Sequence, residues 1–275
     1  MKNFNTYQKS VTAFYIFLVA FWVYLYLTDH TGGTLNYWYS FLFGLIPLTG
    51  GLIGMLKASV WGGLKSALGR AVFFVSLGLF LWGLGETVWS YYNFFKGVPA
   101  PYPSLADIGF APSIFFWILG TAYLSRATGA LFVLKKSRKA KLLVFLLPLI
   151  LLVPSYYLQV QLARGGVLVP EGEGALKTVL DIAYPFGDFL ALLFAALVAI
   201  LSYRYFGGIY RLAVYYLLAG LAIMYCADSV FSYTTSEGTY YNANGGDLLL
   251  TTGLFFITVG ILGFASKPSA ASKAK

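Results

Sequence analysis

The sequence has little charge and few of the residues that build soluble catalytic centres. Charged residues make up 11% of the 275 residues and hydrophobic residues 59%, and the mean hydropathy is +0.74. This composition excludes a soluble globular domain and is typical of a multi-span membrane protein.

Cysteine and histidine each occur once. Cys226 falls inside an apolar segment, so there is no disulfide framework or thiolate cluster, and we expect a small buried residue rather than a redox group. His30 lies outside the apolar segments, so neither haem ligation nor a Ser-His-Asp hydrolase site has support. No apolar segment carries a central lysine for a retinal Schiff base. Phosphate-binding glycine motifs and zinc-protease helix motifs are also absent, so nothing specific indicates an enzyme.

Eight apolar stretches are long enough to cross a bilayer, which needs about 20 residues per helix. They predict an all-α, eight-helix transmembrane domain over residues 1–275, with spans at 8–28, 37–57, 70–93, 105–125, 140–160, 176–203, 209–233 and 246–266. The first stretch is long and aromatic and lacks a small-residue cleavage site, so we expect a span rather than a removable signal peptide.

Charge is divided between the two sets of loops that these spans create. The acidic residues and three basic residues, Lys96, Arg164 and Lys177, fall on one side. The remaining basic residues fall on the other side: Lys2, Lys9, Lys57, Lys65, Arg70, Arg126, Lys135, Lys136, Arg138, Lys139, Lys141, Arg204, Arg211, Lys267, Lys273 and Lys275. The positive-inside rule therefore predicts a multi-pass protein of the cell membrane with both termini in the cytoplasm.

The net charge of +9 comes from these loops, so we do not expect nucleic acid as a partner. We expect the basic run 135–139 to fix topology and contact anionic lipid headgroups, with a specific protein partner as the alternative.

Residues 78–120 and 220–260 resemble each other as two copies of a helix-loop-helix unit. At an offset of 142 the matches are Gly78/Gly220, Glu86/Asp228, Val88/Val230, Trp89/Phe231, Ser90/Ser232 and Tyr91/Tyr233. At an offset of 140 they are Asp107/Asp247, Phe115/Phe255, Phe116/Phe256 and Gly120/Gly260. Because four spans separate the copies, we predict two parallel four-helix repeats, about 1–130 and 131–275, both with the same orientation.

Six carboxylates lie within or at the outer ends of the predicted helices: Glu86, Asp107, Asp181, Asp188, Asp228 and Asp247. A carboxylate at membrane depth costs several kcal/mol unless it is paired, protonated or hydrated, so each should face the bundle interior or an outer cavity. The three basic residues of that side are expected near the rim. Carboxylates without counterions must hold protons or recruit a cation.

The candidate ligand-binding residues combine these acids with nearby aromatic side chains: Glu86, Trp89, Tyr102, Asp107, Asp181, Tyr184, Asp188, Asp228 and Asp247. Asp181, Tyr184 and Asp188 share one helical stripe because their spacing is i, i+3, i+7. An alternative for Asp107, Asp228 and Asp247 is that they cap helices or lie in the headgroup zone. For Asp107 and Asp247, next to predicted helix starts, we favour capping.

The ligand suggested by this chemistry is a cation. Oxygen ligands in this number suit calcium, whereas one His and one Cys serve a soft transition metal poorly. An organic cation could instead be held by the outer aromatic residues Trp82, Trp89, Tyr91, Tyr92, Tyr102, Tyr233, Tyr240 and Tyr241. Because Trp and Tyr also gather at membrane interfaces, we give an interfacial belt more weight than a cage.

Two segments carry a family resemblance. Residues 85–92 (GETVWSYY), followed by 101–107 (PYPSLAD), resemble a pattern in MASE-like multi-span sensor modules that precede GGDEF/EAL or kinase output domains in bacterial signalling proteins. Residues 181–188 (DIAYPFGD) are similar to a second element of those modules. The resemblance implies a membrane-embedded sensory or ligand-binding module. Since the sequence ends soon after the last span, we expect any output from a separate membrane or cytoplasmic signalling protein.

Sensing or ligand binding in an outward-facing acidic and aromatic pocket is thus the leading functional prediction. A small secondary transporter or cation/proton carrier is the first alternative, because parallel halves and intramembrane acids suit it. An accessory membrane subunit is the second alternative.

Overall fold

The computed structural model describes residues 4–97, 101–168, 174–202 and 211–265, and these residues form helices without a strand. Eight helices are long and apolar enough to cross a membrane, which confirms the predicted number of spans. They are α1 Thr6–Leu27, α2 Thr34–Lys57, α3 Ala67–Tyr91, α4 Asp107–Ala127, α6 Arg138–Tyr156, α7 Ala175–Ser202, α8 Arg211–Ser236 and α9 Gly245–Leu262. The chain is therefore a multi-pass membrane protein.

Three features lie outside the sequence prediction. The short helix α5, Ala130–Lys136, joins α4 to α6. Helices α3 and α6 each continue into a π-helical turn, at Tyr92–Lys96 and Tyr157–Leu162 respectively. Both π-helical turns lie at the same end of the bundle as the acidic side chains described below.

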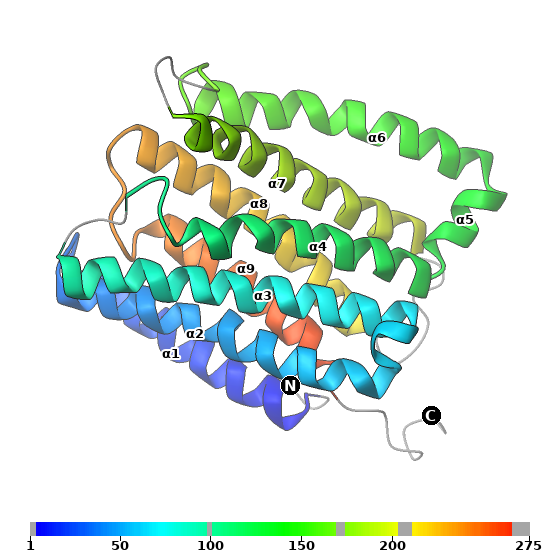
Figure 1. The fold of residues 1–275 in the computed structure, drawn as a ribbon, viewed down its shortest axis with the longest axis horizontal. Coiled ribbons are helices and arrows are strands. Elements are labelled where there is room, and N and C mark those ends of the chain that lie inside the picture. The colour runs from blue at the N-terminus through cyan, green and yellow to red at the C-terminus, as the bar shows by residue number, and fades with distance from the viewer. Residues whose placement is uncertain (1–3, 98–100, 169–173, 203–210, 266–275) are drawn as a thin grey trace.

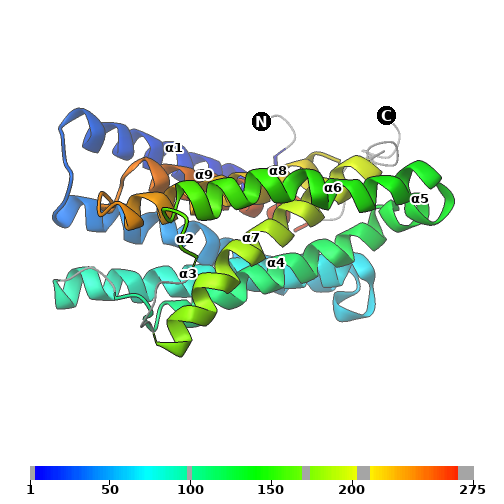
Figure 2. The same ribbon diagram turned by 90° about the horizontal axis from the view of Figure 1, so that it is seen from above.

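The long helices lie side by side along the long axis of the molecule (Figure 1). The start of α1 is joined to the end of α9, because Asn5 Nδ2 donates to the Leu262 carbonyl (2.7 Å) and Gln8 Nε2 to the Val259 carbonyl (2.9 Å). Helix α7 crosses the bundle obliquely (Figure 2). Helix α6 lies at the periphery, with most of its apolar side chains exposed.

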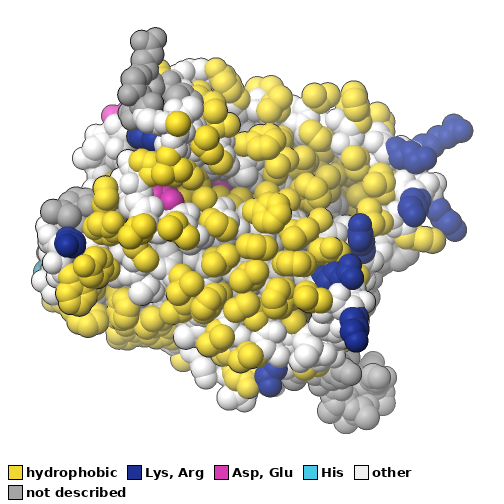
Figure 3. Space-filling view, in the orientation of Figure 1, with side chains coloured by type: hydrophobic (Ala, Val, Ile, Leu, Met, Phe, Trp, Pro, Cys, Tyr) yellow, Lys and Arg dark blue, Asp and Glu magenta, His cyan; other side chains and the backbone are white. Residues whose placement is uncertain are grey.

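Basic side chains gather at one end of the bundle (Figure 3). This end holds the start of α1, the α2–α3 connection and the α4–α5–α6 segment, whereas Lys96, Arg164 and Lys177 belong to the opposite end. The predicted basic positions Lys2, Arg204, Lys267, Lys273 and Lys275 lie outside the described residues.

Glycines set the close packing of α3 against α4 and of α8 against α9. A Cβ added to Gly78 would lie 2.8 Å from the Ser113 carbonyl oxygen, and one added to Gly220 would lie 2.9 Å from that of Gly253. Such distances leave no room for a side chain, so the absence of a Cβ permits the close approach of the helix backbones.

The glycines of the second helix in each pair repeat this arrangement. A Cβ on Gly120 would lie 2.8 Å from the Val75 nitrogen, and one on Gly260 would lie 2.7 Å from the Leu217 nitrogen. Val75 and Leu217 are themselves related by the offset of 142. Both helix pairs therefore make close contacts at matching positions.

The expectation that Cys226 is buried is wrong. Its side chain is exposed on α8, on a stripe that includes Leu212, Ala219 and Tyr233 at seven-residue intervals. On a membrane helix this stripe faces lipid, and a small apolar side chain has no need of burial there.

Candidate functional site

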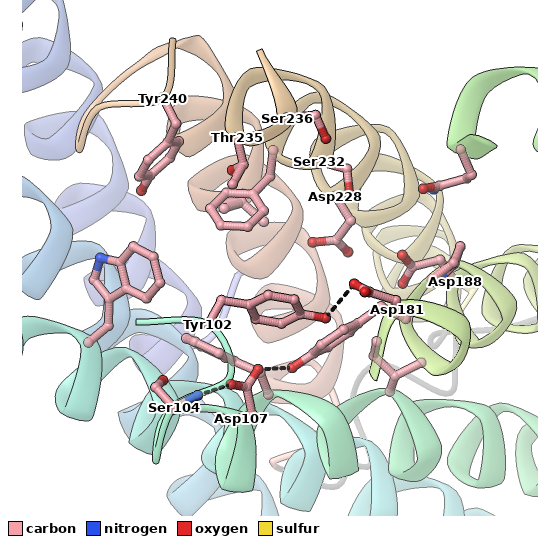
Figure 4. Close-up of a pocket in the computed structure, with 18 of the residues that line it drawn as sticks. Tyr102, Ser104, Asp107, Asp181, Asp188, Asp228, Ser232, Thr235, Ser236 and Tyr240 are labelled. Atoms are coloured by element: carbon pink, nitrogen blue, oxygen red, sulfur yellow. Dashed lines mark hydrogen bonds between the residues drawn. The ribbon is translucent and has the colours of Figure 1, made fainter. Parts of the chain in front are cut away.

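A cavity of about 610 Å³ lies at the end of the bundle that carries the acidic side chains. Helices α2, α3, α4, α7, α8 and α9 contribute to its wall, together with the loops before α4 and α9, the π-helical turn after α6 and residues 164–168 that follow it. All nine candidate residues line this cavity, and Figure 4 shows several of them converging from different helices. The fold thus brings together residues spread from position 86 to position 247.

The cavity wall is rich in carboxyl groups and poor in cations. Of the described residues, six carboxyl groups line it, but only two basic side chains, Arg164 and Lys177. Both basic side chains contact Asp181: Arg164 Nη1 donates to its backbone carbonyl (2.5 Å), and Lys177 Nζ lies 3.7 Å from its Oδ2. Within the described part of the chain, the other five cavity carboxyl groups form no ion pair.

Two tyrosines connect the carboxyl groups of α4 and α7. The Tyr102 hydroxyl donates to Asp181 Oδ1 (3.0 Å), and the Tyr184 hydroxyl donates to Asp107 Oδ1 (2.6 Å) (Figure 4). Burial, and then the hydrogen bond to Asp181, raise the pKa of Tyr102 above its usual value. Tyr102 therefore keeps its proton and acts as a hydrogen-bond donor at the mouth of the cavity.

Glu86 is held against α2. The Ser40 hydroxyl donates to its Oε1 (2.6 Å), and the side chain is only 4% exposed. Gly44 makes room for it, because a Cβ at that position would lie 2.5 Å from Glu86 Cγ. The second carboxyl oxygen of Glu86 has no hydrogen-bond donor among the described residues.

Asp247 is fixed at the start of α9. Its Oδ2 accepts from the Ala243 backbone N–H (2.7 Å), and the Tyr240 hydroxyl donates to its Oδ1 (3.3 Å). Burial, followed by the nearby charges of Asp247 and Glu86, raises the pKa of Tyr240 well above its usual value. Tyr240 is therefore a neutral donor beside two acids.

Asp107 and Asp247 lie in the first turns of α4 and α9, but the N-cap residues of these helices are Ala106 and Asn244, so the expectation that the two acids cap helices is wrong in detail. Asp107 begins α4 and accepts the Ser104 backbone N–H (2.7 Å), as Asp247 accepts that of Ala243. Both therefore order a helix start and also line the cavity. Asp228 lies inside α8, eight residues before its end at Ser236, so it caps nothing.

Asp188 of α7 and Asp228 of α8 point toward each other in the cavity wall (Figure 4). In the described part of the chain, neither carboxyl group accepts a hydrogen bond from an N–H group, and the charge of each acts on the other. The side chain of Asp188 is 6% exposed, and it interacts electrostatically with the positive charge of Arg164. Two facing carboxylates repel each other unless a proton or a cation lies between them.

An aromatic cluster closes one side of the cavity. The rings of Trp89, Phe231 and Tyr240 meet edge to face, with centroids 6.1 Å apart for Trp89 and each partner and 4.9 Å apart for Phe231 and Tyr240. Trp89 is oriented by Asn242, whose Oδ1 accepts from its Nε1 (3.0 Å).

The eight aromatic residues considered for a cage divide into two groups. Trp82, Trp89, Tyr102 and Tyr240 line the cavity. Tyr91 and Tyr233 are exposed, as expected of an interfacial belt, and Tyr92 and Tyr241 do not contribute to the cavity wall.

Among the described residues, no group of three or more His, Cys, Asp or Glu side chains is arranged to hold a metal ion. The acids surround the cavity instead of converging on one point. Calcium needs six to eight oxygens at 2.3–2.6 Å, which this spread of carboxyl groups does not offer.

Several site residues were missed from the sequence. Ser40 and Asn242 position Glu86 and Trp89 through tertiary contacts that leave no local signal. The hydroxyl side chains Ser232 and Thr235 did carry a signal, because they follow Asp228 at i+4 and i+7 on one face of α8 and line the cavity with it.

Comparison of the chain with models of known protein families, with curated proteins and with solved structures gave no match.

Proposed function

We propose that the protein is a membrane sensory or ligand-binding module whose outer cavity binds a small organic cation. The observation that carries this proposal is the convergence, within the part of the chain that the structure describes, of six carboxyl groups and only two cations on one aromatic-lined cavity. Buried carboxyl groups without partners are costly, and a bound cation removes that cost.

An organic cation fits the wall better than a metal ion does. The volume of about 610 Å³ lies within the range of small-molecule sites. Aromatic rings attract alkylammonium groups through their negative faces, and Trp89, Phe231 and Tyr240 supply three rings beside the carboxyl groups. The absence of a metal-holding cluster in the described residues agrees with this choice.

In this proposal the cavity opens to the outside of the cell and both termini are cytoplasmic. The support is the positive-inside rule: basic side chains gather at the end opposite the cavity. The two parallel repeats are part of the same proposal. Their support is the matching glycine contacts of α3 with α4 and of α8 with α9.

Helix α7 favours sensing over transport, because it joins the cavity to the cytoplasmic end. It carries Asp181 and Asp188 in the wall and, at its far end, Ser202, whose hydroxyl pairs with that of Thr128 (2.9 Å). Its 28 residues span about 42 Å. Ligand contact can therefore move the segment next to the basic run 135–139, at the junction of α5 and α6, where we propose that a signalling partner binds.

Thermal unfolding of the purified protein in lipid nanodiscs tests the proposal. Hexylamine should stabilise the protein, by about 2.7 kcal/mol at a hundredfold excess over Kd, whereas neutral 1-hexanol and calcium chloride should not. Glu86→Gln/Asp188→Asn should lose the response. Glu237→Gln, an exposed acid outside the cavity, should keep it.

Equal responses of wild type and the double variant, or none in either, would refute the binding site. Stabilisation by calcium alone would replace the organic cation with a metal ion. Uptake of a radiolabelled primary amine, 1,4-diaminobutane, into proteoliposomes separates sensing from transport. Uptake that depends on Asp188 would overturn the sensory role in favour of a carrier.

A further inference from the structure

The cavity acids form two clusters, and each cluster draws on both halves of the chain. Glu86 of α3 and Asp247 of α9 line the cavity beside the same aromatic pair: the Tyr240 hydroxyl donates to Asp247 Oδ1 (3.3 Å), and the Tyr240 ring contacts that of Trp89, which lies one turn from Glu86 (centroids 6.1 Å apart). On the other side, Asp107 of α4 and Asp228 of α8 both act on the Tyr184 hydroxyl. The sequence repeat places Glu86 with Asp107 and Asp228 with Asp247. In the fold the pairs differ: Glu86 is grouped with Asp247, and Asp107 with Asp228.

This exchange is what a two-fold relation between the halves would produce. The offset of 142 carries Glu86 onto Asp228, and the offset of 140 carries Asp107 onto Asp247. The two offsets together therefore relate the cluster of Glu86 and Asp247 to the cluster of Asp228 and Asp107. Trp89 and Phe231, which are equivalent by the same offset, meet with ring centroids 6.1 Å apart, as residues beside such an axis must.

Each cluster contains carboxyl oxygens that lack a donor. In the first cluster, Glu86 uses one oxygen for Ser40 and leaves the other without a donor, although its side chain is 4% exposed. In the second, neither Asp188 nor Asp228 accepts a hydrogen bond from an N–H group of the described residues, and Asp188 is 6% exposed. These carboxyl groups border the cavity, so a ligand that brings N–H groups to both places can supply the donors that the protein does not.

The two basic side chains of the wall do not meet this need. Lys177 pairs with Asp181, and Arg164 donates to the Asp181 carbonyl. Arg164 acts on the second cluster only through its charge on Asp188. In the described residues, no basic side chain acts on Glu86 or Asp247.

We infer that the cavity binds a linear dication, an α,ω-diamine or a longer polyamine, with one primary ammonium in each acidic cluster; this inference rests on the proposed function. A primary ammonium offers three N–H donors, which a quaternary ammonium lacks. The methylene chain lies against the apolar part of the wall, to which Trp82, Phe110 and Leu250 belong.

Chain length provides the test. Isothermal titration of the nanodisc-embedded protein with diamines from 1,3-diaminopropane to 1,10-diaminodecane should give an optimum at one intermediate length. The best diamine should bind at least about tenfold more tightly than the monoamine of the same length, or about 1.4 kcal/mol. Hexamethonium, a diquaternary cation without N–H groups, should bind more weakly than 1,6-diaminohexane.

Single variants at equivalent positions provide the second readout. Glu86→Gln and Asp228→Asn should each reduce diamine affinity to that of the monoamine, while hexylamine still binds through the remaining cluster. Glu237→Gln should leave both affinities unchanged. The thermal unfolding midpoint of each variant, measured without ligand, reports folding separately.

The outcomes distinguish the proposed function, which is binding of an organic cation, from the further inference that the cation has two charged ends. If no amine binds, the proposed function itself fails. If hexylamine binds as tightly as every diamine, or if affinity rises steadily with chain length without an optimum, the cavity binds one cation and the two-ended inference is overturned. If only one of the two equivalent variants affects diamine binding, the clusters are not equivalent and the inference is also overturned.

Discussion

Glu86 shows how a single intramembrane carboxyl group is accommodated. Its position depends on two α2 residues one turn apart: Ser40 donates a hydrogen bond to it, and Gly44 leaves space for its Cβ and Cγ. The aliphatic part of the side chain is packed, so only the carboxyl end reaches the cavity. A glycine without any unusual backbone angle thus becomes a determinant of the site.

We predict that Gly44→Ala displaces Glu86. The added Cβ would lie 2.5 Å from Glu86 Cγ and 2.9 Å from its Cβ, so the side chain must move or α2 must separate from α3. Overpacking of this kind costs about 1–3 kcal/mol. Thermal unfolding in nanodiscs measures the loss, and titration with the best-binding diamine should show weaker binding.

The matched control is Gly245→Ala, a helical glycine with no atom within 4 Å of its added Cβ. It should unfold at the wild-type temperature or slightly above, because alanine favours helix. Wild-type stability and binding in Gly44→Ala would show that the Gly44 contact does not position Glu86.

Tyr184 gives a second prediction at this scale. Tyr184→Phe removes the hydroxyl that donates to Asp107 Oδ1 (2.6 Å) and leaves that oxygen without a donor. Leaving a fully buried acceptor unsatisfied costs about 1–3 kcal/mol, and because Asp107 is half-buried we expect a loss near the low end, about 1 kcal/mol. Thermal unfolding should detect the loss, while Tyr233→Phe, at an exposed tyrosine of α8, should change little. Equal stability of the two variants would contradict a structural role for the Tyr184–Asp107 bond.

At the scale of elements, two helix pairs, α3 with α4 and α8 with α9, form the tightly packed centre of the bundle. Gly120 and Gly260 face backbone atoms of the neighbouring helix at equivalent positions. The backbone of a packed helix cannot rotate away as a side chain can. The contacts therefore restrict the distance between helices directly.

We predict that Gly120→Ala and Gly260→Ala destabilise the protein by similar amounts. The added Cβ would lie 2.8 Å from the Val75 nitrogen in the first and 2.7 Å from the Leu217 nitrogen in the second. Each helix pair must separate, at a cost of about 1–3 kcal/mol. Chemical denaturation in mild detergent measures both, with Gly245→Ala as the reference. A large loss in one variant and none in the other would show that the two pairs pack differently.

The elements also show what the sequence could and could not predict. Apolar runs predicted all eight spans, because an unbroken stretch of that length has few other stable environments. Helix α5 was missed because its Ala130–Lys136 segment is too short to have a distinct apolar period. The exposure of Cys226 was missed because every face of a lipid-embedded helix is apolar, so composition does not reveal which face is buried.

The cavity depends on the whole molecule. The cost of isolated acids in a membrane predicts that they face the interior, and the nine candidate residues do surround one cavity. Which acids become neighbours depends on how the halves face each other. The sequence repeat grouped Glu86 with Asp107, whereas in the fold Glu86 and Asp247 lie beside the same pair of rings, Trp89 and Tyr240. No pattern within one half contains that information.

Orientation in the membrane is the property on which the whole proposal depends, because a cavity that faces the cytoplasm would sense a different compartment. We predict that the loop end bearing Asp29 is extracellular and the end bearing Lys135 is cytoplasmic, following the positive-inside rule. In a Cys226→Ala background, Asp29→Cys should react with a membrane-impermeant maleimide in intact cells. Lys135→Cys should react only after permeabilisation. Both positions are exposed in the structure, so access to the side chain does not limit either reaction.

The parent Cys226→Ala variant reports the background, and a permeant maleimide confirms that both introduced thiols are reactive. The reverse labelling pattern would place the acidic cavity in the cytoplasm, where polyamines and inorganic cations are at different concentrations and the basic loop would face outward. Labelling of both positions in intact cells would contradict a single orientation. Because the two sites lie at opposite ends of the same bundle, one experiment on both variants decides between these arrangements.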